Sequence, residues 1–143
     1  MTTITIADWQ QSPDIVVGEN EHRRLVTAAL TDVTKDADPI DFLLYELDRA
    51  KVMADELLPS DIVRLNSIVR YRSGHAGEER TVKLVLPGEI NWDTGYRLSV
   101  TSMDGAALLG LRPGQILSWL SPGGTSDQVE VIKVANAFAG RGR

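Results

Sequence analysis

The sequence contains no cysteine among its 143 residues. That absence excludes disulfide bonds, thiol nucleophiles and thiolate zinc sites, and it is typical of proteins from a reducing compartment. No apolar run approaches the roughly 20 residues that a membrane-spanning helix needs. The first residues lack the basic start and apolar core of a signal peptide. We therefore expect a soluble, cytoplasmic protein with no membrane partner.

Side chains that carry catalysis are also scarce. The two histidines, His22 and His75, lie far apart, and no paired-histidine metal motif occurs. The glycine-containing segments match neither a phosphate-binding loop nor a dinucleotide fingerprint, and no serine has a histidine at a useful spacing. The sequence therefore predicts no catalytic residue, no metal site and no cofactor, and a protein that is not an enzyme.

Positive charge is scarce in the first part of the chain. Residues 1–58 carry five Lys/Arg and twelve Asp/Glu, whereas residues 59–143 carry ten and eight. Nucleic-acid binding depends on Lys and Arg neutralising phosphates, so we expect no strong direct nucleic-acid binding. An acidic surface suits a basic protein surface or a metal-bearing site on a partner.

Two helical patterns follow an irregular lead-in over residues 1–18. The first begins at Asn20 and repeats apolar residues at three- and four-residue steps through Val33. The second begins at Asp38, a good N-cap before Pro39, and its stripe continues until Pro59 ends it. Two stripes joined by a short polar loop predict an antiparallel helical hairpin, a short coiled coil with arms of about 20–27 Å.

Two aromatic residues of the second helix lie off its main apolar stripe. Phe42 and Tyr45 would be superfluous in a simple two-helix pair. They either pack against the lead-in or the following domain, or they form a contact face for a partner. The sequence leaves both interpretations open.

After Pro59 the apolar period shifts to two. Alternation predicts five strands, at residues 66–72, 80–86, 96–100, 115–120 and 128–134. A short helix capped by Ser102 or Asp104 and stopped by Gly110 lies between the third and fourth strands, followed by a Pro-Gly turn at residues 112–115. The fold class is therefore α+β, with an antiparallel β domain. We place the lead-in and hairpin at residues 1–58, the β domain at 59–136 and a flexible tail at 137–143.

Carboxylates gather at the predicted turn of the hairpin. Asp32, Asp36 and Asp38 would lie at its tip. Crowded carboxylates could complete the oxygen shell of a cation such as Mg²⁺. Acidic residues at a helix start are also what capping and the helix dipole select.

The β region resembles that of the Gre-type transcript cleavage factors. The matching segments are "LNSIV" at residues 65–69, "LSV…GAALLGLRPG" within residues 98–114 and "PGG" at residues 122–124. They cover roughly residues 57–135 in the expected order. The resemblance is closer to short-armed relatives described as regulators of nucleoside diphosphate kinase. It implies that the β domain is FKBP-like.

The resemblance also implies a partner and a docking mode. In the family the β domain docks on RNA polymerase at the secondary channel, and acidic residues at a long arm's tip help to hold a catalytic Mg²⁺. The positions that match the docking segment are Thr101, Ser102 and Met103, where the family usually has an X-Pro pair before the helix. The arms of this chain are short, so we assign Asp32, Asp36 and Asp38 to tip electrostatics only.

Three functional hypotheses follow. The first is a binding protein that occupies the entrance of the polymerase channel, competes with Gre factors and does not cleave transcripts efficiently. The second is a true transcript cleavage-stimulating factor. The third is a regulator of nucleoside diphosphate kinase that acts away from the polymerase.

Overall fold

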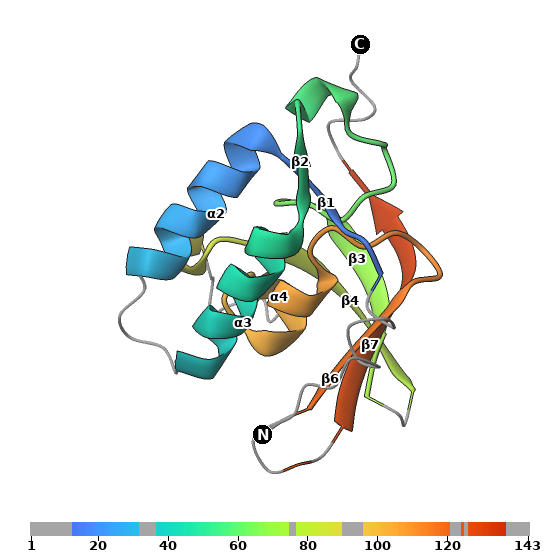
Figure 1. Ribbon diagram of the computed structural model, residues 1–143. Coiled ribbons are helices and arrows are strands. Elements are labelled where there is room, and N and C mark those ends of the chain that lie inside the picture. The colour runs from blue at the N-terminus through green and yellow to red at the C-terminus, as the bar shows by residue number, and fades with distance from the viewer. Residues whose placement is uncertain are drawn as a thin grey trace.

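The computed structural model describes residues 13–31, 37–74, 77–89, 96–120, 124 and 126–136. The elements of the first part of the chain are β1 (Val16–Gly18), α2 (Glu19–Thr31), α3 (Ala37–Arg49), β2 (Lys51–Met53) and the 3-10 helix η1 (Asp55–Leu57). The two strands pair in parallel. Helices α2 and α3 lie side by side (Figure 1). None of the helices described is long and apolar enough to cross a membrane.

The second part of the chain forms a five-stranded sheet in the order β5-β4-β3-β7-β6. Its elements are β3 (Ile68–Ser73), β4 (Glu78–Val85), η2 (Pro87–Glu89), β5 (Arg97–Ser99), α4 (Met103–Leu108), β6 (Ile116–Leu120) and β7 (Ser126–Ala135). Neighbouring strands are antiparallel except β4 and β5, which are parallel. The prediction of a wholly antiparallel domain is therefore wrong at the β5 edge.

The local predictions for the second part are otherwise confirmed. All five predicted strands are present, and α4 has Ser102 as its N-cap. Gly110 has φ +83° directly after the helix, and Gly114 has φ +91° in the predicted turn. Both values lie in the left-handed region that favours glycine. The amide of Gln115 donates to the carbonyl of Arg112 (3.0 Å), which closes that turn.

The first part departs from prediction at the lead-in and at the end of α3. The described part of the lead-in places two residues in the core, Val17 of β1 and Ile15 directly before that strand. Helix α3 ends at Arg49 rather than near residue 58, because the amide of Lys51 donates to the carbonyl of Ile15 (2.9 Å) and the chain continues as β2. The pairing of β1 with β2 ends the helix at Arg49. The apolar stripe that predicted a longer helix continues beyond Arg49, but those residues are not helical.

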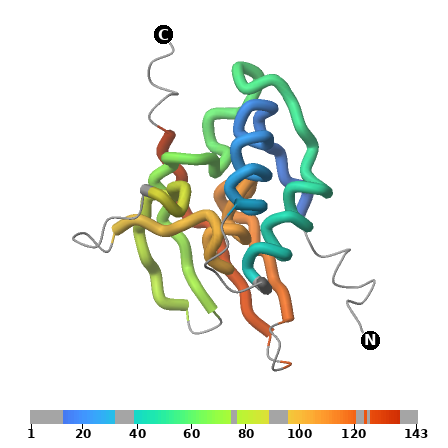
Figure 2. The backbone as a smooth tube through the Cα atoms, turned by 90° about the vertical axis from the view of Figure 1, so that its left-hand side faces the viewer, coloured from blue at the N-terminus to red at the C-terminus, as the bar shows by residue number. Residues whose placement is uncertain are grey.

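One hydrophobic cluster joins the helices to the sheet. It contains Leu25 and Ala29 of α2, Leu43 and Leu47 of α3, and the buried residues of α4 and the sheet. Helix α4 contacts α3 on one side and β7 on the other. Figure 2 shows the layer of α2 and α3 along one side of the molecule and the β3–β4 pair on the other. The described part of the helical pair therefore packs on the β domain, and α3 contacts α4 directly.

Candidate docking edge and helical groove

The predicted docking segment lies where β5 turns into α4. Ser102 has φ −85° and ψ 162°, and its Oγ accepts a hydrogen bond from the amide of Gly105 (3.0 Å). The same hydroxyl donates to the carbonyl of Ser99 (2.7 Å), and so does the Ser102 amide (3.1 Å). A capping side chain that also bonds the preceding strand fixes the angle between strand and helix. We call residues 101–104 the docking edge.

Thr101 differs from its two neighbours in exposure. Its side chain is 2% exposed, and its Oγ1 shares a hydrogen bond with Ser99 Oγ (2.8 Å). Ser102 and Met103 are half-buried. A partner can therefore contact Ser102 and Met103, whereas Thr101 can act only by shaping the backbone.

Asp104 ties the docking edge to the sheet. Its Oδ2 accepts hydrogen bonds from the hydroxyls of Tyr71 (3.0 Å) and Ser73 (3.1 Å) on β3. The Tyr71 hydroxyl also accepts from Arg80 (3.1 Å) on β4. Burial of Tyr71, and secondarily the Asp104 carboxylate, raises the pKa of its hydroxyl well above the ordinary value. The hydroxyl therefore stays protonated and donates to Asp104.

Gly105 allows α4 to approach β5 closely. A Cβ at this position would lie 2.1 Å from the backbone carbonyl oxygen of Ser99. Backbone cannot move aside as a side-chain end can, so only glycine fits between the cap and the strand. The spacing of Ser102, Asp104 and Gly105 is thus set by the geometry of the docking edge.

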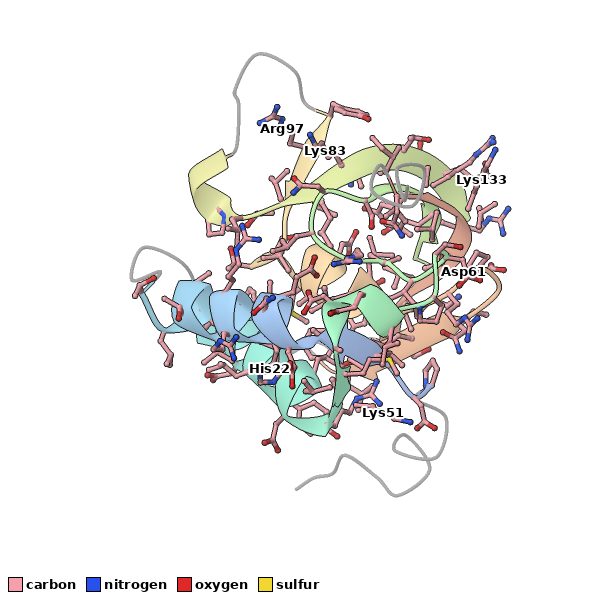
Figure 3. All side chains as sticks on the ribbon, turned by 90° about the horizontal axis from the view of Figure 1, so that it is seen from above. His22, Lys51, Asp61, Lys83, Arg97 and Lys133 are labelled. Carbon is pink, nitrogen blue, oxygen red and sulfur yellow. The ribbon has the colours of Figure 1, made fainter. Side chains whose placement is uncertain are left out.

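A groove of about 650 Å³ opens between α2, α3 and β2. We call it the helical groove; its lining residues are His22, Val26, Asp41, Leu44, Tyr45, Leu47, Asp48, Ala50 and Val52. His22 Nε2 lies 3.1 Å from the carbonyl oxygen of Leu47, and Figure 3 shows His22 on α2 beside α3. Burial raises the pKa of the Tyr45 hydroxyl; the Arg49 guanidinium opposes the rise and the Glu46 carboxylate adds to it.

The two predicted partner-face residues are separated by the structure. The Phe42 ring packs on Trp119 of β6, with centroids 5.5 Å apart and planes tilted by 43°. Phe42 therefore belongs to the contact between α3 and the sheet, which was one of the two interpretations left open by the sequence. Tyr45 lines the helical groove and is 39% exposed.

The positions of the predicted tip side chains are not described by the structure. Asp32 and Asp36 lie outside the described residues, and so does the side chain of Asp38, although its backbone belongs to α3. Across the described ranges, no group of three or more His, Cys, Asp or Glu side chains could hold a metal ion.

Sequence reasoning missed a buried carboxylate that joins the two parts of the chain. Glu21 of α2 accepts from Arg64 Nε (3.0 Å) and from the amide of Leu65 (3.2 Å). Arg64 also approaches Asp55 Oδ2 (3.5 Å), whose other oxygen accepts from the amide of Asn20. The only sequence signal was that Glu21 lies one helical turn before Leu25, on the face that α2 buries.

The sequence and the fold of the chain match one known class of proteins. The family model for the C-terminal domain of transcription elongation factors GreA/GreB matches residues 58–136. The solved structure of a prokaryotic transcription elongation factor GreA/GreB from Nitrosomonas europaea is 32% identical, with a TM-score of 0.66, over 87% of this chain and 100% of that one. The chain belongs to the GreA/GreB family of transcription elongation factors, which confirms the predicted assignment.

Two individual relatives are also similar to this chain in sequence. The chain is 35% identical over 122 residues to the regulator of nucleoside diphosphate kinase of Escherichia coli, which covers 85% of this chain and 89% of that protein. It is also 36% identical over 86 residues to the transcription inhibitor protein Gfh1 of Thermus thermophilus, over 59% of this chain and 54% of that protein.

Proposed function

We propose that this protein is a transcription regulator of the GreA/GreB type. It binds RNA polymerase at the secondary channel through its docking edge, competes there with Gre factors and does not cleave transcripts efficiently. The family supports the class, and the likeness to a protein named as a transcription inhibitor supports a regulatory role.

The observation that carries the docking proposal is the rigidity of the docking edge. Hydrogen bonds fix both flanks of Met103: Ser102 is held by Ser99 and Gly105, and Asp104 by Tyr71 and Ser73. A surface that is ordered before binding loses little conformational entropy when a partner docks. Its contact atoms are mainly those of Ser102 and Met103.

We infer the absence of efficient cleavage from the short length of the helical arm. Helices α2 and α3 each contain 13 residues, which at 1.5 Å per residue is about 20 Å. Both also share the hydrophobic cluster of the β domain, and α3 contacts α4 directly. Carboxylates on so short an arm cannot enter the coordination shell of a metal ion deep within the polymerase channel.

Competition for purified polymerase tests the docking. We expect the full-length protein to displace a labelled Gre factor, and Met103→Glu to weaken this displacement about tenfold because a charge enters the contact. Leu57→Glu is the matched control, since Leu57 is exposed on η1 away from the docking edge. Failure of the unaltered protein to compete at high excess would remove the main support for docking.

Transcript cleavage in stalled complexes tests the second part. We expect no shortening of the RNA when the protein is added. If cleavage occurs, Asp36→Asn with Asp38→Asn distinguishes the source: loss of cleavage with retained binding would make this a true cleavage factor, and an unchanged rate would exclude both residues.

The second candidate function is regulation of nucleoside diphosphate kinase away from the polymerase. The name of the E. coli relative, which matches over 85% of this chain, favours it. A purified kinase assayed with and without the full-length protein tests it directly. An unchanged kinase rate and no complex in a pulldown of the two purified proteins would exclude this function.

A further inference from the structure

We propose that the helical groove is a second docking site, which takes a basic amphipathic helix of a partner protein. It lies on α2, α3 and β2 rather than at the docking edge, and it does not depend on the proposed function.

The floor of the groove is apolar, and its edge at Val52 and Tyr45 is accessible. It is formed by Val26, Leu44, Leu47, Ala50 and Val52. Val52 is 43% exposed, and Tyr45 beside it is 39% exposed. Val26, Leu44 and Ala50 are half-buried, and Leu47 is buried. Single exposed apolar residues are ordinary on protein surfaces, but exposed and half-buried ones gathered around one concavity indicate a binding surface.

The α3 side of the groove carries two carboxylates. Asp41 and Asp48 are seven residues apart, so they face the same side two turns and about 10.5 Å apart. Both are exposed, and neither forms an ion pair with any residue that the structure describes. The nearest cation on the helix, Arg49, is already bound to Glu46 and to the carbonyl of Pro13.

These features specify the partner's chemistry. A helix in a groove presents anchors at positions i, i+3, i+4 and i+7. Basic side chains at i and i+7 would match Asp41 and Asp48, and apolar side chains at i+3 and i+4 would meet the floor between them. The wall opposite α3 is fixed by the contact of His22 with the Leu47 carbonyl.

Charge complementarity selects this occupant over a second copy of the chain. Residues 1–58 carry twelve acidic and five basic side chains. A second copy that offered the same face would bring two regions of net negative charge together, and like charges at an interface disfavour association. A basic helix has the opposite sign, so its charge favours association with this face.

The test uses the full-length protein and a designed peptide. The probe is an Ala-rich peptide of about 18 residues, long enough to be helical in isolation, with Lys at i and i+7 and Leu at i+3 and i+4. We expect binding in fluorescence anisotropy, and amide chemical-shift changes in α2, α3 and β2 but not at residues 101–104. Asp41→Asn with Asp48→Asn should weaken binding about tenfold at low salt, and Tyr45→Ser by a similar factor.

Two controls keep the result specific. Glu78→Gln removes an exposed carboxylate of β4, outside the groove, and should leave the affinity unchanged. A peptide with Glu in place of Lys should bind at least tenfold more weakly. The proposal is overturned if the basic peptide does not bind, if both peptides bind equally, if the shift changes map outside the groove, or if the chain dimerises through it.

Discussion

The helical layer and the β domain bury their polar side chains in different ways. Among the described residues, the buried charged side chains are both on helices of the first part: Glu21, 5% exposed, and Glu46, 1% exposed. The buried polar side chains of the second part are the neutral hydroxyls of Ser67 and Thr101. Glu21 and Glu46 are each bound by an arginine, Arg64 and Arg49.

This difference shows how the two parts are held. Ladders of backbone hydrogen bonds organise the sheet, and short-range hydroxyl contacts complete it. The helical layer has few strand partners and is tied to distant segments by charge: Glu21 reaches Arg64, and Arg49 reaches the Pro13 carbonyl. A buried charge that loses its partner costs several kcal/mol, so these single residues add to the attachment that the hydrophobic cluster provides.

The largest expected effect comes from Gly105→Ala. The new Cβ would lie 2.1 Å from the Ser99 carbonyl oxygen, so α4 must move away from β5. Because α4 contacts both α3 and β7, we expect both parts to lose about 3 kcal/mol of unfolding free energy together. Urea denaturation followed by circular dichroism measures this.

Gly88→Ala is the matched control for that change. A Cβ at Gly88 has no atom within 4 Å among those described, so the free energy of unfolding should change by less than about 0.5 kcal/mol. Equal losses for the two variants would mean that the close approach of α4 to β5 is not what limits stability.

The next effect is expected from Glu21→Ala. The change leaves Arg64 without its 3.0 Å partner and the Leu65 amide without an acceptor. Arg64 keeps its contact with Asp55, so we expect a loss of about 2–3 kcal/mol. Limited proteolysis should cut the first sixty residues before the β domain.

Glu19→Gln, which changes an exposed carboxylate in the same first turn of α2, should have little effect on stability or on proteolysis. If Glu21→Ala left both parts equally resistant to protease, the inference that charge pairs help to hold the helical layer on the β domain would be wrong.

A smaller effect is expected from Tyr71→Phe, at about 1–2 kcal/mol near neutral pH, because Asp104 loses one of its two hydroxyl donors. Burial raises the pKa of Tyr71 above its ordinary value of 10.0. Above about pH 10 the unfolded chain therefore releases this proton while the folded protein retains it. Stability then falls as pH rises, by about 1.4 kcal/mol per pH unit from this one group.

Tyr71→Phe should lack that part of the slope. The difference between the two proteins, measured by urea denaturation at several pH values, should therefore shrink from neutral pH to pH 11. The other groups that titrate in this range, including Tyr45, are common to both proteins and cancel. A difference that stayed constant or grew with pH would contradict the buried, hydrogen-bonded state of Tyr71.

The sequence predicted the β domain better than the helical layer, for a physical reason. The strands and α4 are specified by local signals: period-two alternation, the Ser102 cap and the glycines at 110 and 114. The pairing of β1 with β2 depends on two three-residue strands far apart in sequence, which no local pattern encodes. It decides where α3 ends.

The same distinction applies to the site residues. The position of the docking edge followed from a resemblance, and its hydrogen bonds were only visible in the fold. The burial of Phe42 depends on Trp119, a distant residue of β6. The helical groove needs α2, α3 and β2 at once, so single-helix periodicity could identify Tyr45 but not the surface around it.

Met103→Pro is expected to change stability the least. It also distinguishes most clearly between two ways in which the docking edge could bind a partner. Met103 is the first residue of α4, where proline is favoured because its φ suits the helix start. The preceding residue must be extended, and Ser102 already has φ −85° and ψ 162°. We therefore expect the protein to fold normally and to gain about 0.4–1 kcal/mol from the stiffer unfolded chain.

Binding to purified polymerase then shows what the methionine does. If the docking edge works mainly through its fixed backbone, Met103→Pro should bind as well as the unaltered protein or better. If the flexible Met103 side chain supplies apolar contact, binding should weaken although stability rises. Asp104→Pro is the control, because it removes the carboxylate that Tyr71 and Ser73 hold. It should weaken both binding and stability, which separates loss of the edge from loss of a single contact.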